Sequence, residues 1–156
     1  MKTAWILIGE ANSRKSTVSR LLTGVSRIDR PVEVKYASAA RVKMHAMVSA
    51  AQESRLQPVK LISKLNGFQS KENGRCQDLN FVVVLRYDKL NRCPPGEAYV
   101  DELMRAGWQI AWIVSLGEGL RPWVNTKTQN CFAIANSKLM ASNHIASLIR
   151  PRFNWL

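Results

Sequence analysis

Hydrophobic residues alternate with polar turns along the chain, and several form short continuous runs. Such runs predict buried strands over residues 3–8, 79–85, 108–116 and 131–135. Residues 32–37 instead alternate between apolar and charged side chains, which predicts a half-exposed strand. The pattern therefore predicts about five strands.

Apolar residues at helical spacing occupy most of the segments between these strands. A helix is predicted over 15–23, where Val18, Leu21 and Leu22 share one face before Gly24. Further helices are predicted over 38–56, 58–66, 97–106 and 138–149. The longest, 38–56, would bury one apolar face formed by Ala40, Met44, Met47, Val48 and Ala51. Loops are predicted over 67–77, 91–96 and 117–129.

Alternation of buried strands with helices is typical of an α/β protein with a mostly parallel sheet. We therefore expect one domain, residues 1–156, built as a three-layer sandwich around a sheet of about five strands. A chain of this length can bury a core without disulfides.

Charge is the unusual feature of the composition. Lys and Arg number 23 and Asp and Glu 11, so the formal net charge is +12. This excess favours polyanionic partners, namely nucleotide phosphates, nucleic acid or an acidic protein. The alternative is a basic protein whose charged residues are simply solvated.

Cysteines and hydrophobic runs bear on the compartment. Cys76, Cys93 and Cys131 are scattered and form no CxxC pair, which is typical of reduced thiols in a cytoplasmic protein. The apolar run Ala4–Ile8 is too short for the core of a signal peptide, and no run approaches the ~18 residues of a membrane span. We expect a cytoplasmic protein without a membrane partner.

The first predicted strand leads into a recognisable loop. Residues 9–17 read Gly-Glu-Ala-Asn-Ser-Arg-Lys-Ser-Thr and resemble the P-loop (Walker A) pattern G-x-x-x-x-G-K-[ST] of the P-loop NTPases. Gly9, Lys15 and Ser16 match, whereas Arg14 stands where the family has its second glycine. The flanking strand and helix are the context that this pattern requires. The resemblance implies a P-loop NTPase-like fold that binds a nucleoside triphosphate and Mg²⁺.

The resemblance also implies a role for each loop residue. Backbone N–H groups of such a loop cradle phosphates, and the following helix directs its dipole at them. Lys15 would reach the β- and γ-phosphates, Ser16 would hold Mg²⁺, and Thr17 would lie near the α-phosphate. The phosphate-binding set implied is Gly9, Asn12, Ser13, Arg14, Lys15, Ser16 and Thr17. Arg14 would either keep a right-handed helical backbone with its guanidinium outward, or add a phosphate contact.

An acidic residue at the end of a second buried strand would complete a magnesium site. Asp88 follows strand 79–85 and Glu118 follows strand 108–116. We choose Asp88, because its strand is the more apolar, as the second metal ligand and as a catalytic residue beside Lys15. The alternative is an ordinary loop aspartate next to Lys89.

Ligands of open α/β sheets bind at the carboxyl ends of the strands. That edge is expected to collect residues 9–17, 37–38, 86–92, 115–121 and 136–138, with Arg92 or Arg121 as a candidate phosphate-sensing arginine. The guanine-specific N-K-x-D motif is missing, which favours ATP over GTP.

Two functions are consistent with these patterns, and a third possibility is a small α/β protein whose loop binds only sulfate or phosphate. The first is a P-loop nucleotide-binding protein that acts as a weak NTPase or as a phosphotransferase. The second is a non-catalytic basic protein on a P-loop scaffold that binds nucleic acid or an acidic protein. For the second, a basic face is predicted from Lys35, Arg41, Lys43, Arg55, Lys60, Lys64, Lys71 and Arg75. Whether the protein is an enzyme stays open at this point.

Overall fold

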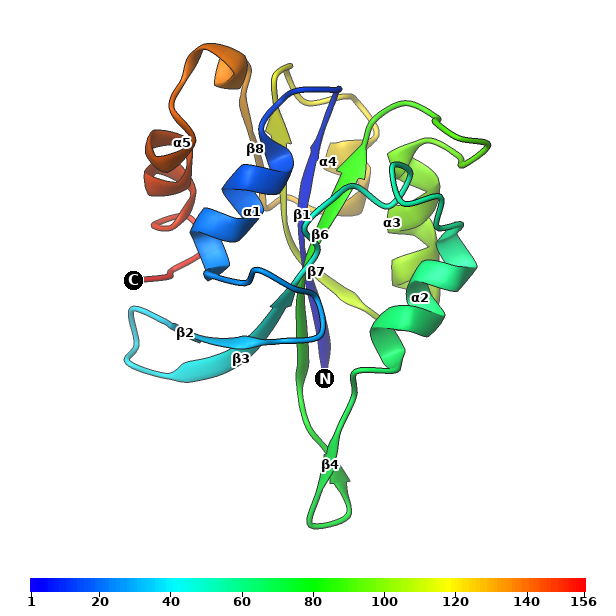
Figure 1. Cartoon of the computed structure of the whole chain (residues 1–156), viewed down its shortest axis with the longest axis vertical. Coiled ribbons are helices and arrows are strands. Elements are labelled where there is room, and N and C mark those ends of the chain that lie inside the picture. Colours follow the sequence, from blue (N-terminus) through cyan, green and yellow to red (C-terminus); the bar gives the residue numbers. More distant parts are fainter.

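A computed structural model describes residues 1–156, and its centre is a six-stranded sheet (Figure 1). The strand order is β2-β3-β6-β1-β7-β8, and every neighbouring pair is parallel except β2 and β3. The strands span β1 Lys2–Gly9, β2 Val32–Lys35, β3 Arg41–Ala46, β6 Leu79–Arg86, β7 Gln109–Leu116 and β8 Cys131–Ile134. The predicted α/β class with a mostly parallel sheet is confirmed.

Five α-helices flank the sheet. They span α1 Lys15–Thr23, α2 Pro58–Asn66, α3 Gly96–Arg105, α4 Val124–Lys127 and α5 Ser142–Ile149, with a 3₁₀ turn at Ser137–Leu139. The last predicted helix therefore starts four residues late, at Ser142. A small hairpin of β4 (Lys71–Glu72) and β5 (Arg75–Cys76) interrupts the predicted loop 67–77 and extends away from the sheet (Figure 1). No helix is long and apolar enough to cross a membrane.

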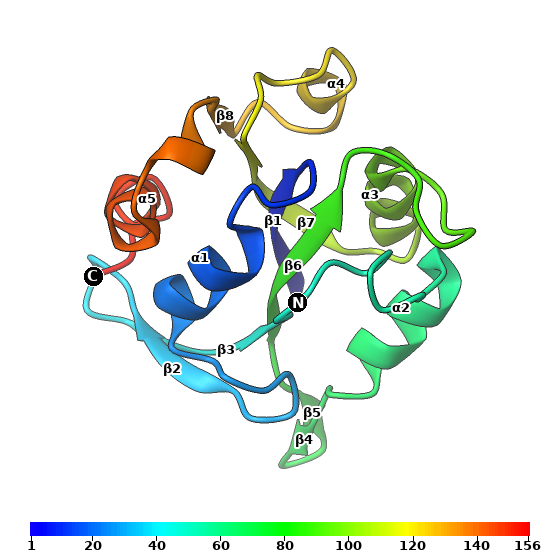
Figure 2. The same ribbon diagram turned by 45° about the horizontal axis from the view of Figure 1, so that its top comes forward.

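Helices cover both faces of the sheet, with α1 and α5 on one face and α2 and α3 on the other (Figure 2). The central strand β1 supplies side chains to both cores because successive residues point in opposite directions. Ile6 and Ile8 lie in the core that includes residues of α2 and α3. Leu7 lies in the core that includes residues of α1 and α5. This two-sided burial explains why the β1 sequence is continuously apolar.

The predicted helix over 38–56 is wrong, because residues 41–46 form strand β3. Val42, Met44 and Ala46 satisfy strand alternation as well as parts of a helical pattern, so periodicity alone did not separate the two. The β2–β3 turn has Ala39 at φ 66°, which a continuous helix does not allow. Strand β3 is additional to the five predicted strands, so the sheet has six strands instead of about five.

This correction changes which segments meet at the carboxyl edge of the parallel strands. Residues 37–38 lie in the β2–β3 turn, which is at the opposite edge because β2 runs antiparallel to β3. The segment 47–56, which follows β3, takes their place. That edge, at the top of Figure 1, carries the β1–α1 loop and the loops after β6, β7 and β8.

Candidate functional site

The β1–α1 loop (residues 10–14) begins at Gly9, where β1 lies between two parallel neighbours. Gly9 pairs with Arg86 of β6 and with Leu116 of β7. A Cβ at position 9 would lie 2.2 Å from the Leu116 carbonyl oxygen and 2.7 Å from Ser13 Oγ. Only glycine therefore fits at this position, and the loop turns tightly over the end of the sheet.

Arg14 departs from the expectation of a right-handed helical backbone. It has φ 68° and ψ 14°, in the left-handed region, and directly precedes α1 as its N-cap. Arg14 thus stands at the second glycine of the P-loop pattern, in a backbone conformation that has no steric penalty for glycine. The Arg14 guanidinium lies on the surface, with Nη2 3.4 Å from the Lys138 carbonyl oxygen.

Backbone donors of the loop and of the first turn of α1 are left without partners in the protein. The N–H groups from Asn12 to Thr17 donate to no protein acceptor, and the first helical bond runs from Val18 N to Arg14 O at 2.9 Å. Residues 12–17 and Glu53 line a hollow of about 190 Å³, which we call the loop hollow. Successive free amides at a helix N-terminus form an anion-binding concavity.

Lys15 lies beneath this loop and is 4% exposed. Its Nζ donates to the Glu10 carbonyl oxygen at 2.5 Å and to Ser13 Oγ at 3.2 Å. Burial lowers the pKa of Lys15 to about 8, while the nearby Glu53 carboxylate opposes this shift. The loop therefore holds a desolvated ammonium whose only acceptors are uncharged oxygens.

Glu53 is a hollow-lining residue that the sequence analysis missed. It lies in the turn after β3, within the segment that had been predicted as helix. Glu53 and Ser16 line the same hollow, and a carboxylate and a hydroxyl are oxygen ligands of the kind that Mg²⁺ prefers. The signal that would have found Glu53 is the alternation of residues 41–46, which makes it a residue at the carboxyl edge of a strand.

Asp88 does not line the loop hollow. Its side chain is 65% exposed and accepts hydrogen bonds from Arg121 at 2.9 and 3.2 Å, which lowers the Asp88 pKa. Glu118 pairs with the same arginine at 3.2 Å. The last residue of β6 itself is Arg86. The structure therefore brings Ser16 together with Glu53 and not with Asp88, whose metal and catalytic roles stay predictions.

Residues 136–138 pack against the β1–α1 loop, as expected for segments at the same edge. Ser137 Oγ donates to the Ser13 carbonyl oxygen at 3.2 Å, and Lys138 Nζ lies 2.8 Å from a Glu10 carboxylate oxygen. Gly117 also approaches closely, since a Cβ there would lie 3.0 Å from Ser13 Cβ. These contacts fix the shape of the loop.

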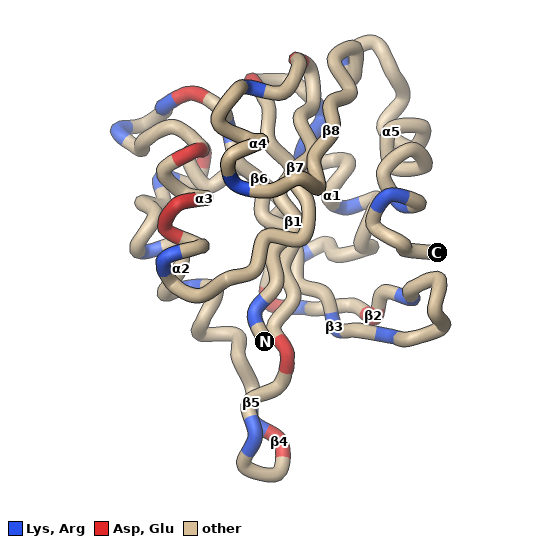
Figure 3. Tube along the Cα trace, turned by 180° about the vertical axis from the view of Figure 1, so that it is seen from behind, with Lys and Arg blue, Asp and Glu red and all other residues tan.

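The residues of the predicted basic face belong to several separate elements. Lys35, Arg41 and Lys43 lie on β2 and β3, whereas Lys60 and Lys64 lie on α2. In Figure 3, Lys and Arg positions occur on strands, helices and the β4–β5 hairpin. The set therefore does not follow one face of one element, and Arg41 and Lys43, which fall within the predicted helix 38–56, lie on strand β3 instead.

Comparisons with known proteins add no relative. No family model, no curated protein and no solved structure matches the chain. Function is therefore inferred from the loop, its hollow and the side chains around them.

Proposed function

We propose that this chain is a P-loop nucleotide-binding protein, a three-layer α/β domain that holds ATP and Mg²⁺ at the β1–α1 loop. The observation that supports the proposal is the row of six N–H groups, Asn12 to Thr17, that have no protein acceptor beside the buried Lys15 ammonium. A polyphosphate would supply acceptors to all of these donors at once.

Each residue of the loop hollow has a role in this proposal. The free amides would bind β- and γ-phosphate oxygens, and Lys15 would exchange the carbonyl of Glu10 for a charged phosphate oxygen. Ser16 and Glu53 would hold Mg²⁺. Bound Mg²⁺ would neutralise charge on the phosphate oxygens. Gly9 would keep the loop close to the end of the sheet.

The chemistry proposed is phosphoryl transfer or weak hydrolysis. Efficient hydrolysis needs a residue that positions the attacking water. Arg86 ends β6, and Asp88 is already bound to Arg121, so neither orients water in the loop hollow. We therefore favour phosphotransfer to a second substrate.

ATP is preferred over GTP in this proposal. The nearest approach to a guanine motif, residues 125–128, lies at α4, where Lys127 Nζ is bound to Asp101 at 2.5 Å and lies 3.8 Å from Glu97. This lysine is therefore engaged by carboxylates.

Calorimetric titration with ATP and with GTP, each with and without Mg²⁺, tests the proposal. We expect Mg²⁺-dependent ATP binding by the wild type and its loss in Lys15→Ala, because the variant removes the only buried cation of the hollow. Lys71→Ala is the charge-matched control, since Lys71 is exposed on the distant β4–β5 hairpin. Equal ATP affinity in Lys15→Ala and Lys71→Ala, or no heat in any wild-type titration, would contradict the proposal.

A non-catalytic basic binding protein is the second candidate, and the net charge of +12 favours it. In that case Lys15→Ala would leave binding of an RNA or DNA oligonucleotide unchanged. The logarithm of the affinity for the oligonucleotide would fall linearly with the logarithm of salt concentration, because binding would release counterions.

A further inference from the structure

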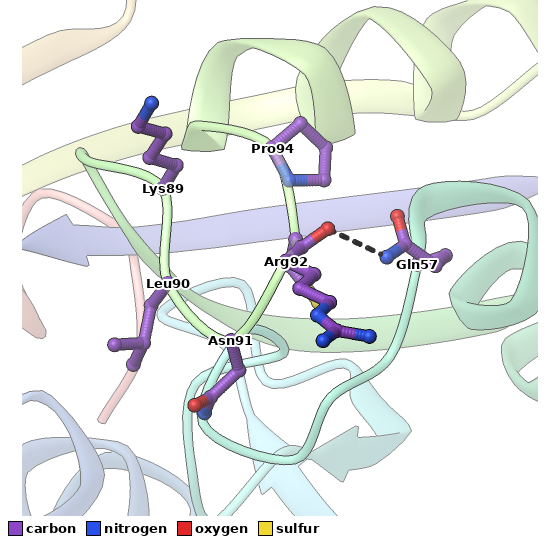
Figure 4. Close-up of a pocket in the computed structure, with 7 residues that line it drawn as sticks. Gln57, Lys89, Leu90, Asn91, Arg92 and Pro94 are labelled. Atoms are coloured by element: carbon purple, nitrogen blue, oxygen red, sulfur yellow. Dashed lines mark hydrogen bonds between the residues drawn. The ribbon is translucent and has the colours of Figure 1, made fainter.

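A second polar hollow lies between the start of α2 and the loop that joins β6 to α3. It measures about 610 Å³ and is lined by Arg55, Gln57, Lys60, Asn91 and Arg92. We call these five residues the basic cleft. A neighbouring hollow of about 780 Å³, lined by residues 89–94 and Gln57, continues from it. Figure 4 draws this second part.

Positive charge in the basic cleft is not neutralised by the protein. Arg55, Lys60 and Arg92 take part in no ion pair, and no Asp or Glu lines either hollow. In Figure 4 the Arg92 guanidinium lies on the side of the loop that faces Gln57, whereas Lys89 extends the other way. Like charges held together without an acidic partner are the counterpart of an anionic ligand.

The backbone of the cleft is held in an unfavourable conformation. Arg55, Asn91 and Arg92 have φ values of 56°, 52° and 63°, all in the left-handed region. Hydrogen bonds hold the two walls together, with Gln57 Nε2 donating to the Arg92 carbonyl oxygen at 2.9 Å and Asn91 Nδ2 to the Gln52 carbonyl oxygen at 3.1 Å. Non-glycine residues in this region persist where the surroundings enforce them, and they cluster at binding sites.

Backbone donors add to the positive charge of the side chains. The N–H groups of Val59 and Lys60, in the first turn of α2, donate to no protein acceptor. These N–H groups lie at the N-terminal end of α2, directly after Gln57. This end of the helix carries the positive end of the helix dipole.

The basic cleft adjoins the loop hollow through one short segment. Glu53 lines the loop hollow and Arg55, two residues later, lines the cleft. Directly before Glu53, buried Gln52 donates to the Arg86 carbonyl oxygen at 2.9 Å and accepts from the Arg86 N–H at 3.0 Å. Because Arg86 pairs with Gly9, both sites are attached to the same end of the sheet.

We propose that the basic cleft binds the phosphate group of a small anionic second substrate, next to the nucleotide in the loop hollow. Its size suits a small molecule, and its cations and free amides suit a phosphate. The role as second substrate rests on the proposed function, whereas anion binding by the cleft does not.

In the transfer, an acceptor oxygen would form a bond to the γ-phosphorus, and the bond from that phosphorus to the β–γ bridging oxygen would break. ADP would leave, and the acceptor's proton would pass to solvent.

Titration of ¹⁵N-labelled protein with inorganic pyrophosphate, followed by amide chemical shifts, tests the proposal. The wild type should show two responding groups, residues 12–17 and residues 89–93. In Lys15→Ala only residues 89–93 should respond. In Arg92→Gly the affinity reported by residues 89–93 should fall by about tenfold or more, since one charge-assisted contact is lost. Glycine is chosen because it adopts the left-handed backbone of position 92 without strain, so the melting temperature should rise.

Two controls and two competing ligands make the outcome decisive. Ala39→Gly makes the same backbone change in the distant β2–β3 turn, and Arg75→Ala removes an exposed arginine from β5; neither should alter pyrophosphate binding. Silence of residues 89–93 in every variant overturns the proposal, and so does a response to citrate or to a DNA oligonucleotide but not to pyrophosphate. A response of residues 89–93 alone, without one from 12–17, supports the cleft and contradicts nucleotide binding.

Discussion

The loop hollow is lined by Glu53 and the basic cleft by Arg55, two residues later, yet the two sites present positive charge in different ways. The loop hollow uses backbone N–H groups around a single buried lysine. The basic cleft uses exposed side chains from two segments far apart in sequence, among them Arg55 and Arg92. Apart from Glu53, the first is a local structure encoded by nine consecutive residues, whereas the second exists only after folding.

This difference has consequences for rigidity. Main-chain donors are fixed by the turn of the loop and by α1, so they need no ordering when an anion binds. Arginine and lysine side chains lose rotamer freedom on binding, and each contact is correspondingly weaker. The loop hollow is therefore suited to holding a polyphosphate in one position, and the basic cleft to admitting and releasing a smaller anion.

Gln52→Leu is the change that should disturb both regions most. The Gln52 side chain is fully buried and binds both the N–H and the carbonyl of Arg86. Leucine would leave these two part-buried backbone groups without their partner, at about 1–3 kcal/mol for each. We expect the free energy of unfolding, measured in urea, to fall by about 3 kcal/mol.

The matched control is Gln109→Leu, at an exposed position where the side chain forms no hydrogen bond. It should change stability by less than about 0.5 kcal/mol. A wild-type unfolding free energy in Gln52→Leu would show that the two regions are not joined through this residue.

The fold could be predicted wherever one pattern dominated the local sequence. Continuous apolar runs identified β1, β6 and β7, because strands buried on both faces have no polar side to confuse the assignment. Strand β3 was missed because Met44 and Ala46 fit two periodicities, and its pairing with β2 and β6 depends on residues distant in sequence. Tertiary pairing, and not local preference, decides such a segment.

The residues of the candidate site also fall into those that the local sequence predicts and those that depend on the fold. The position of Lys15 at the start of a helix after a buried strand followed from spacing alone. Arg14 was correctly seen as the residue that departs from the pattern, but its left-handed backbone was not anticipated, since arginine rarely adopts it. Glu53 could not be found without β3, and the pairing of Asp88 with Arg121 joins loops 33 residues apart.

A change of pH should separate the loop hollow from the basic cleft. The pKa of Lys15 in the free protein is about 8, and a bound phosphate would raise it by favouring the charged form. Above pH 8 the protein must therefore take up a proton in order to bind ATP, so affinity should fall as pH rises. Calorimetry at pH 7 and pH 9 should show a loss of about tenfold.

Pyrophosphate binding at residues 89–93 provides the comparison, because the arginines of the basic cleft stay charged over this range. Their response should change much less than ATP affinity between the two pH values. An ATP affinity that is constant from pH 7 to pH 9 would mean that the ammonium of Lys15 does not contact phosphate.

Arg14→Gly should produce the smallest effect and should show whether the loop hollow needs the Arg14 side chain. The substitution restores the glycine of the P-loop pattern at φ 68°. It should raise the free energy of unfolding by about 1 kcal/mol, because it relieves a left-handed non-glycine backbone. ATP affinity should stay within about threefold if the amides do the binding, since a change of 0.65 kcal/mol corresponds to about that ratio.

Ala39→Gly, at φ 66° in the β2–β3 turn, measures the backbone contribution without any change near the loop. If both variants gain the same stability but Arg14→Gly alone loses ATP affinity by about tenfold, the Arg14 guanidinium contacts phosphate. The loop hollow would then resemble the basic cleft in depending on an exposed arginine.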